Sequence, residues 1–202
     1  MYVLTVDQRG SRRHGDRVAG LLEDLTSRVP ADAGGVVRPF ERTVGDEVQA
    51  VLDDADVAVD VALTLLRIGG WSVGIGVGSV DEPLPVSARA GSGEAFIHAR
   101  AAVERAKSRA RPVPLAVVSE APDGGRGAEA VLTLLGSVVV RRSAAGWAVI
   151  DAMTTPGATQ DDAARRLGIS QQAVSQRLRA ALWAEEVAAR PVAARLLAEG
   201  DG

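Results

Sequence analysis

Apolar residues recur with two different periods along the first 119 residues of the chain. Short runs rich in valine and other β-branched residues predict strands. These strands are expected at 2–6, 36–43, 47–52, 71–80 and 113–119. Apolar positions spaced by three or four residues predict helices between them. These helices are expected at 18–29, 57–68 and 91–112.

The pattern also indicates how the strands pair. The runs 36–43 and 47–52 flank a short turn and predict an antiparallel hairpin, with Pro39 at a sheet edge or a bulge. In 71–80, Gly74 and Gly76 alternate with apolar residues and leave one face bare, open to a closely packed helix or to a ligand. The order β-α-β-β-α-β-α-β predicts an α/β domain over 1–119, a ferredoxin-like or palm-type α+β sandwich.

The chain changes character after residue 119. Residues 120–127 concentrate glycine, proline and charge, which predicts a linker. We expect an all-α domain over 128–202, with helices near 127–143 and 144–153, although Val138–Val140 also suits a strand. The tail from Leu182 is expected either to pack back on the helix-turn-helix of residues 159–183 or to pair with a second subunit.

Residues 159–183 have the pattern of a helix-turn-helix. Thr159 caps a first helix, Gly168 permits a turn, and Val174 and Leu178 anchor a second helix inward. The outward side chains include glutamine and arginine, which suit adenine and guanine edges. The expected DNA-binding residues are Ser170, Gln171, Gln172, Ser175, Gln176 and Arg179. The segment resembles the helix-turn-helix of sigma-factor region 4 and of response-regulator output domains, and the alternative is a structural hairpin with a solvated face.

Composition narrows the function classes. The net charge is −3, so binding of double-stranded DNA depends on a local patch, and we expect a homodimer to supply two such patches. Aromatic residues make up only 3% of the chain. The chain contains no cysteine, which excludes disulfides and thiol chemistry. No apolar run reaches the roughly 20 residues of a membrane span, so we expect a cytoplasmic protein without membrane contact.

Acidic residues follow the first strand and occupy the hairpin turn. Asp7 and Asp46 are expected at one edge of the sheet, where two carboxylates suit Mg²⁺ or Mn²⁺. Gly10 and Ser11 begin the next helix, whose backbone N–H groups suit a phosphate, and nearby arginines at 9, 12, 13 and 17 add charge. The alternative is an ordinary solvent-facing turn with Asp7 as a cap. His98 is a further candidate to face a ligand, or else a half-buried structural residue.

Two stretches carry a resemblance to known families. "VLTVDQRGSRR" resembles the first-strand metal motif of class III nucleotidyl cyclases, and "TVGDEVQ" resembles their hairpin motif and the diguanylate cyclase signature. As a whole the chain is similar to SatD-family proteins, a bacterial group. The resemblance implies that Asp7 and Asp46 are metal ligands and that Gly45 allows a nucleotide to approach closely.

The chain departs from the cyclase pattern at catalytic positions. Cyclases place an asparagine four residues before an arginine on a late helix, whereas Phe96 precedes Arg100 here and the chain has no asparagine. Losing such groups costs orders of magnitude in phosphoryl-transfer rate. We therefore expect no catalytic residues, and a DNA-binding transcriptional regulator whose cyclase-like domain senses a nucleotide or metal. The alternatives are an active metal-dependent cyclase or NTP hydrolase, and a protein-interaction module.

Overall fold

The computed structural model describes residues 1–201, apart from the side chains of Arg12 and Pro122. Its centre is a five-stranded mixed sheet in the order β2-β3-β1-β4-β5. The strands are β1 (Tyr2–Gln8), β2 (Val36–Arg42), β3 (Glu47–Leu52), β4 (Trp71–Val77) and β5 (Leu115–Ser119). All neighbours are antiparallel except β4 and β5. The predicted mixed α/β class and the hairpin are confirmed, and β2 is an edge strand whose register shifts on both sides of Arg38.

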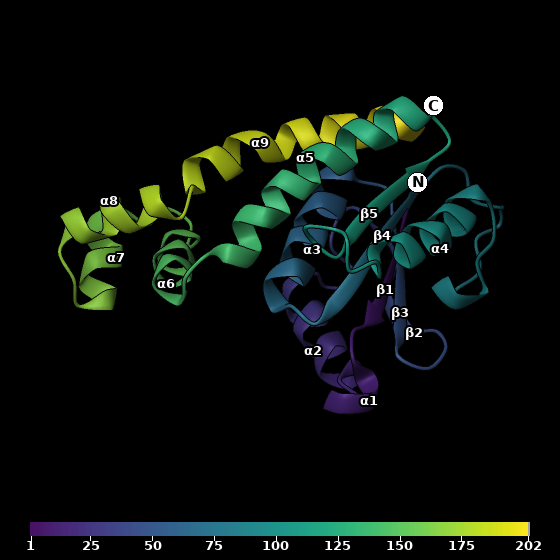
Figure 1. Cartoon of the computed structure of the whole chain (residues 1–202), viewed down its shortest axis with the longest axis horizontal. Coiled ribbons are helices and arrows are strands. Elements are labelled where there is room, and N and C mark those ends of the chain that lie inside the picture. The colour runs from purple at the N-terminus through teal and green to yellow at the C-terminus, as the bar shows by residue number, and fades with distance from the viewer. Residues whose placement is uncertain (202) are drawn as a thin grey trace.

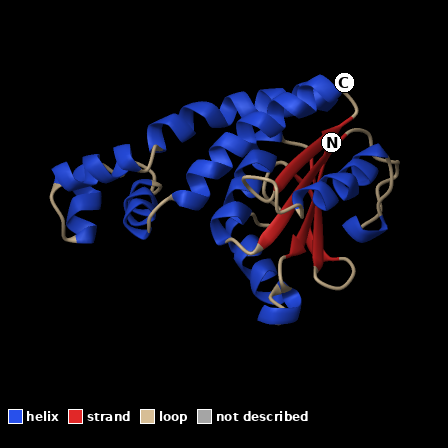
Figure 2. Cartoon of the chain, in the orientation of Figure 1, coloured by secondary structure: helices blue, strands red, loops and turns tan. Residues whose placement is uncertain are grey.

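Helices cover both faces of the sheet (Figure 1, Figure 2). The helices of this part of the chain are α1 (Ser11–His14), α2 (Val18–Arg28), α3 (Ala55–Ile68), α4 (Glu94–Ala106) and α5 (Pro122–Arg141), with a 3₁₀ turn at Ala88–Ala90. Alternation along β1 divides the core. Leu4 and Val6 pack with α2, α3 and α5, whereas Val3 packs with α4 on the other face.

The bare face of β4 receives α4. A Cβ on Gly76 would lie 2.1 Å from the carbonyl oxygen of Ala95, and one on Gly74 would lie 2.3 Å from the backbone nitrogen of Val103. No side chain fits between these backbones, so the glycines allow α4 to approach the sheet closely. Of the two alternatives for this face, the packed helix is confirmed.

Three short helices form a separate helical module: α6 (Ala144–Met153), α7 (Gln160–Leu167) and α8 (Gln171–Ala180). They have their own small core, which includes Val149, Ile150, Ala163 and Val174. Residues 138–140 are helical, as part of α5, so the strand alternative there is wrong. Figure 1 shows the helical module at one end of an elongated molecule, beyond the antiparallel helices α5 and α9 (Trp183–Ala198).

Two predictions about the second half of the chain need correction. Residues 122–127 are not a linker but the first turns of α5, because their glycines pack against the chain end. A Cβ on Gly124 would lie 2.7 Å from the nitrogen of Gly200. The tail does not pack on the helical module alone. Ala193, Ala194 and Leu197 of α9 enter the core of the sheet domain, which we define as β1–β5 with α1–α5 and α9.

The two ends of the described chain meet. The final 3₁₀ turn, Glu199–Asp201, follows α9, and the Asp201 carboxylate lies 2.7 Å from the amino group of Met1. Among the residues described, no helix is long and apolar enough to cross a membrane.

Candidate functional site

Asp7 lies in a row of polar side chains that crosses three strands. Strand register places Asp7 opposite Glu47 of β3 and opposite Ser72 of β4. Because side chains alternate between the faces of a sheet, Asp46 falls outside this row. Asp46 instead accepts a hydrogen bond at its backbone oxygen from the Gln8 N–H, at 3.2 Å. The structure therefore brings Glu47, rather than the predicted Asp46, directly opposite Asp7.

Lys107 pairs with Asp7 from the end of α4. Its Nζ lies 3.0 Å from the Asp7 carboxylate and 2.7 Å from that of Glu104. Burial raises the pKa of the Asp7 carboxyl, the ammonium of Lys107 acts in the opposite direction, and the charge of Asp46 raises it further. The contacts with Glu104 and Asp7 outweigh burial and raise the pKa of Lys107. The ammonium of Lys107 is therefore held between the carboxylates of Asp7 and Glu104.

The predicted cation site can be compared with these contacts. Mg²⁺ and Mn²⁺ need carboxylate oxygens that are free to bind them, but Asp7 is paired with Lys107. Glu47 accepts a hydrogen bond from the Thr43 hydroxyl at 2.7 Å. Within residues 1–201, no three Asp, Glu or His side chains form a group that could hold a metal ion. This arrangement does not fit a resident cation at Asp7, and metal binding by Asp7 and Asp46 stays a prediction.

A groove of about 800 Å³ opens beside Asp7, and we call it the arginine groove. Its basic lining residues are Arg9, Arg13, His14, Arg17, Lys107 and Arg109, and Gly10, Ser11, Gly70 and Ser72 complete much of its wall. The four arginines form no ion pair with any carboxylate of the described chain. The groove therefore concentrates positive charge in a protein whose net charge is −3.

The predicted phosphate-binding residues are only partly brought together. Gly10 and Ser11 line the arginine groove, whereas Gly45 does not and accepts a hydrogen bond at its carbonyl from Arg42 Nε at 2.6 Å. The helix after Gly10 is a single turn, Ser11–His14, so its N-terminus offers little dipole. The side chain of Arg12 lies outside the described residues. Positive charge at this edge comes mainly from arginine side chains.

Sequence reasoning missed Ser72, Lys107 and Arg109 as parts of this groove. Ser72 is fully buried, and its hydroxyl has no hydrogen-bond partner among the described residues. Lys107 had one usable signal, since it is the single lysine of an arginine-rich chain. Ser72 and Arg109 are distant from Asp7 in sequence, and no local pattern links them to it.

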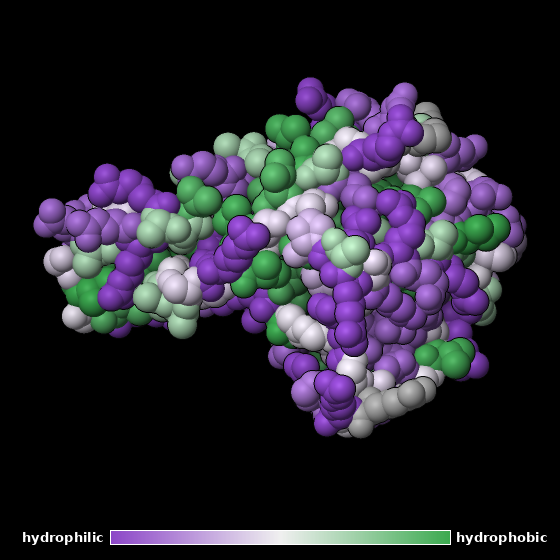
Figure 3. All heavy atoms as spheres, viewed as in Figure 1, coloured by the Kyte–Doolittle hydropathy of each residue, from purple (hydrophilic) through white to green (hydrophobic). Residues whose placement is uncertain are grey.

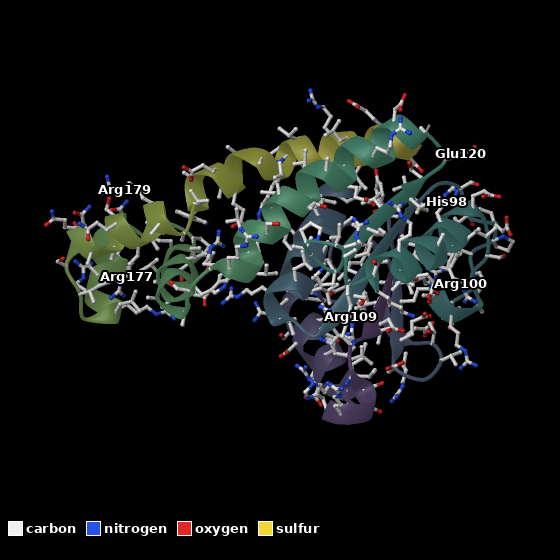
Figure 4. The ribbon with its side chains drawn as sticks, viewed as in Figure 1. His98, Arg100, Arg109, Glu120, Arg177 and Arg179 are labelled. Carbon is white, nitrogen blue, oxygen red and sulfur yellow. The ribbon has the colours of Figure 1, made fainter. Side chains whose placement is uncertain are left out.

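His98 has a structural contact. Its Nδ1 lies 2.7 Å from the carbonyl oxygen of Val77, so this nitrogen is the donor, and its Nε2 lies 3.7 Å from the Glu94 carboxylate. The contacts join α4 to the end of β4. Figure 4 shows His98 and Arg100 on α4, and Arg100 lines a second hollow with Asp7 and Glu104.

A short turn joins the helices α7 and α8, and its local contacts are those that the sequence predicts. Thr159 and Asp162 form a capping box at the start of α7. Gly168 has φ 63°, a left-handed conformation that suits glycine, and Ser170 accepts a hydrogen bond from the Ala173 N–H at 3.2 Å. Val174 is completely buried in the core of the helical module. The orientation of α8 is therefore fixed by caps at one end and by packing along one side.

The outward face of α8 is polar. Among the residues predicted to contact DNA, Ser175 is partly buried and the others are exposed. Gln171 donates a hydrogen bond to Gln160 Oε1 at 2.9 Å. Figure 3 shows hydrophilic residues over the outer surface of α8, and Figure 4 shows Arg177 and Arg179 on opposite sides of the helix. Neither arginine is paired with a carboxylate in the described part of the chain.

Comparisons of the chain with protein-family models, with curated proteins and with solved structures find no match in any of the three. Functional conclusions therefore depend on the geometry of the arginine groove and of α8.

Proposed function

We propose that the protein is a DNA-binding transcriptional regulator, in which α7 and α8 act as a helix-turn-helix and α8 lies in the major groove of double-stranded DNA. The observation that carries this proposal is the exposed row of Gln172, Gln176 and Arg179 on a helix whose other side is buried. Glutamine and arginine side chains form paired hydrogen bonds with adenine and guanine. A purely structural hairpin has no need for this combination on its outward face.

The sheet domain supplies the sensing part of the proposal. With its five-stranded mixed sheet and a basic groove beside Asp7, it suits a small anionic ligand such as a nucleotide. The metal-dependent enzyme is the less well supported alternative, because Lys107 already pairs with the carboxylate that catalysis would need. A homodimer would present two copies of α8 to two half-sites.

The proposal is tested by selecting duplexes from a random library with the full-length protein and measuring binding by fluorescence anisotropy at several salt concentrations. Arg179→Ala removes one base-contacting side chain, so we expect its affinity to fall by roughly 10-fold or more. Affinity should also decrease steeply with salt, since phosphate contacts release counterions.

The matched control is Arg195→Ala, which removes another exposed arginine, from α9 at a site remote from α8. We expect this variant to bind as the wild type does. An equal loss of DNA affinity in both variants would show that the effect depends only on net charge. The absence of any salt-sensitive binding by folded protein would refute the proposal.

A further inference from the structure

The arginine groove contains far more positive charge than its neighbours neutralise. Arg9, Arg13, Arg17 and Arg109 line it without a carboxylate partner in the described chain, whereas Lys107 is paired with both Asp7 and Glu104. Several arginines elsewhere in the described chain are paired with carboxylates. Arg67, for example, lies 2.6 Å from Asp151. An unpaired cluster of guanidinium groups is costly through mutual repulsion, and it is a strong receptor for phosphate oxygens.

The floor of the groove supplies an independent sign of a ligand. Ser72 is 0% exposed, lines the groove, and has no partner for its hydroxyl within residues 1–201. Buried hydroxyl groups are normally hydrogen-bonded, because leaving one unpaired costs free energy. A ligand oxygen, or a water held beneath a ligand, would satisfy this hydroxyl.

Lys107 occupies the position that a cation would need. Its ammonium pairs with Asp7 at 3.0 Å, and Asp7 of β1 lies opposite the unpartnered Ser72 of β4. In a metal-assisted phosphate site, a divalent ion cancels the repulsion between the carboxylate and the phosphate. Here a covalently attached charge already neutralises the carboxylate, and the surrounding arginines can bind phosphate directly.

We propose that the arginine groove binds the polyphosphate group of a small molecule without a divalent cation, with Lys107 acting as a built-in counter-charge for Asp7. This inference deepens the ligand-sensing part of the proposed function and is independent of DNA binding by α8. It names the ligand class as a di- or triphosphate, either inorganic or attached to a nucleoside.

The test is calorimetric titration of the full-length protein with sodium tripolyphosphate, ATP, GTP and adenosine, in EDTA and then in excess Mg²⁺. We expect the phosphates to bind in EDTA at least as tightly as in Mg²⁺, and adenosine not to bind. A nucleotide that binds more tightly than tripolyphosphate identifies the ligand as nucleoside-linked, whereas equal affinity identifies the phosphate chain as the recognised group. The double variant Arg9→Ser/Arg13→Ser should bind at least about 10-fold more weakly, since the loss of even one charge-assisted hydrogen bond corresponds to about that factor.

Two further variants separate the role of Lys107 from general folding. Lys107→Met should weaken binding in EDTA, and Mg²⁺ should partly restore it, because Asp7 then becomes available to the ion. Lys107→Arg keeps the counter-charge and should remain independent of Mg²⁺. Arg28→Ser, outside the groove on α2, is the control for net charge and should leave binding unchanged.

Three outcomes would overturn the inference. Loss of wild-type binding in EDTA would show that a divalent ion is required, and no binding of any phosphate by folded protein would show that the groove is not an anion site. A folded Lys107→Met variant that behaves as the wild type does in both buffers would refute the role of the lysine. None of these results affects DNA binding, which Arg179→Ala tests separately.

Discussion

Replacing Glu186 with glutamine should destabilise the protein strongly, because it leaves a buried guanidinium without a counter-charge. The side chains of Arg142 and Glu186 are 1% and 2% exposed, and Arg142 Nη2 lies 2.5 Å from the Glu186 carboxylate. Arg142 also donates to the Ala181 carbonyl at 2.7 Å and lies over the Trp147 ring, 4.4 Å from its centroid. These contacts hold the guanidinium in place, so it cannot move to water when its partner is lost.

The expected cost follows from this burial. Removing one partner of a buried ion pair costs about 3–5 kcal/mol, whereas removing an exposed partner costs about 0–1 kcal/mol. Asp60→Asn is the matched control, because Asp60 is 60% exposed and pairs with Arg190, which also contacts Glu186. For a chain of this size, 3–5 kcal/mol corresponds to a decrease in Tm of about 6–20 °C.

Urea unfolding followed by tryptophan fluorescence and by far-ultraviolet circular dichroism measures these differences. Trp71 lies in the core of the sheet domain, Trp183 packs against the core of the helical module, and Trp147 packs against both cores. Two transitions in Glu186→Gln would indicate that the helical module unfolds first. The double variant Arg142→Met/Glu186→Leu removes both charges and should recover most of the loss.

One result would contradict the reasoning directly. If Glu186→Gln loses no more stability than Asp60→Asn, the ion pair is hydrated in solution and does not define the joint between α5, α6 and α9. Failure of the double variant to recover stability would show that the packing of these side chains, rather than their charges, is what matters.

Other substitutions test the packing and the caps. Gly76→Ala should destabilise the protein by about 3 kcal/mol or more, because the new Cβ would lie 2.1 Å from the carbonyl oxygen of Ala95. Gly20→Ala on α2 meets no atom within 4 Å and should instead stabilise by up to about 1 kcal/mol, as urea unfolding of both variants would show. The pKa of Asp162 is lowered by hydrogen bonds from Thr159, so its stabilising effect is complete above the ordinary value of 3.8 and is lost as pH falls through the lowered one. The difference in stability between the wild type and Asp162→Asn should therefore be largest at neutral pH and vanish in strong acid, and equal differences at both would refute this assignment.

Local patterns were enough to predict the strands and most of the helices. The alternation of Gly74 and Gly76 with apolar residues even indicated a close backbone approach, although it left open whether a helix or a ligand made it. The helix α4 decides this through small residues such as Ala95 and Ala99, which are completely buried against the sheet. The contact between β4 and α4 joins segments that are separate in the sequence, and the periodicity of apolar residues does not reveal such contacts.

The errors have physical causes. Gly124 and Gly125 indicated a flexible linker, but their small size lets α5 pack against Gly200 and against Ser119 at the end of β5. A Cβ on Gly125 would lie 2.2 Å from the Ser119 hydroxyl oxygen. In the hairpin, a shift of a single residue decides whether Asp46 or Glu47 lies opposite Asp7, and turn sequences do not determine register to that precision. The arginine groove depends on residues from three separate segments, 7–17, 70–72 and 107–109, so only the fold brings it together.

The helical module is attached to the sheet domain by two connections, one leaving α5 and one entering α9, and Arg142 pairs with Glu186 where both connections meet. A domain on a single tether can turn about any axis, whereas a segment held at both ends can swing only about the line that joins its attachments. The ion pair between Arg67 of α3 and Asp151 of α6 restrains even that rotation. If α8 binds DNA as we propose, a duplex must therefore meet it at nearly one angle, and two copies of the protein would accept only a narrow range of half-site spacings.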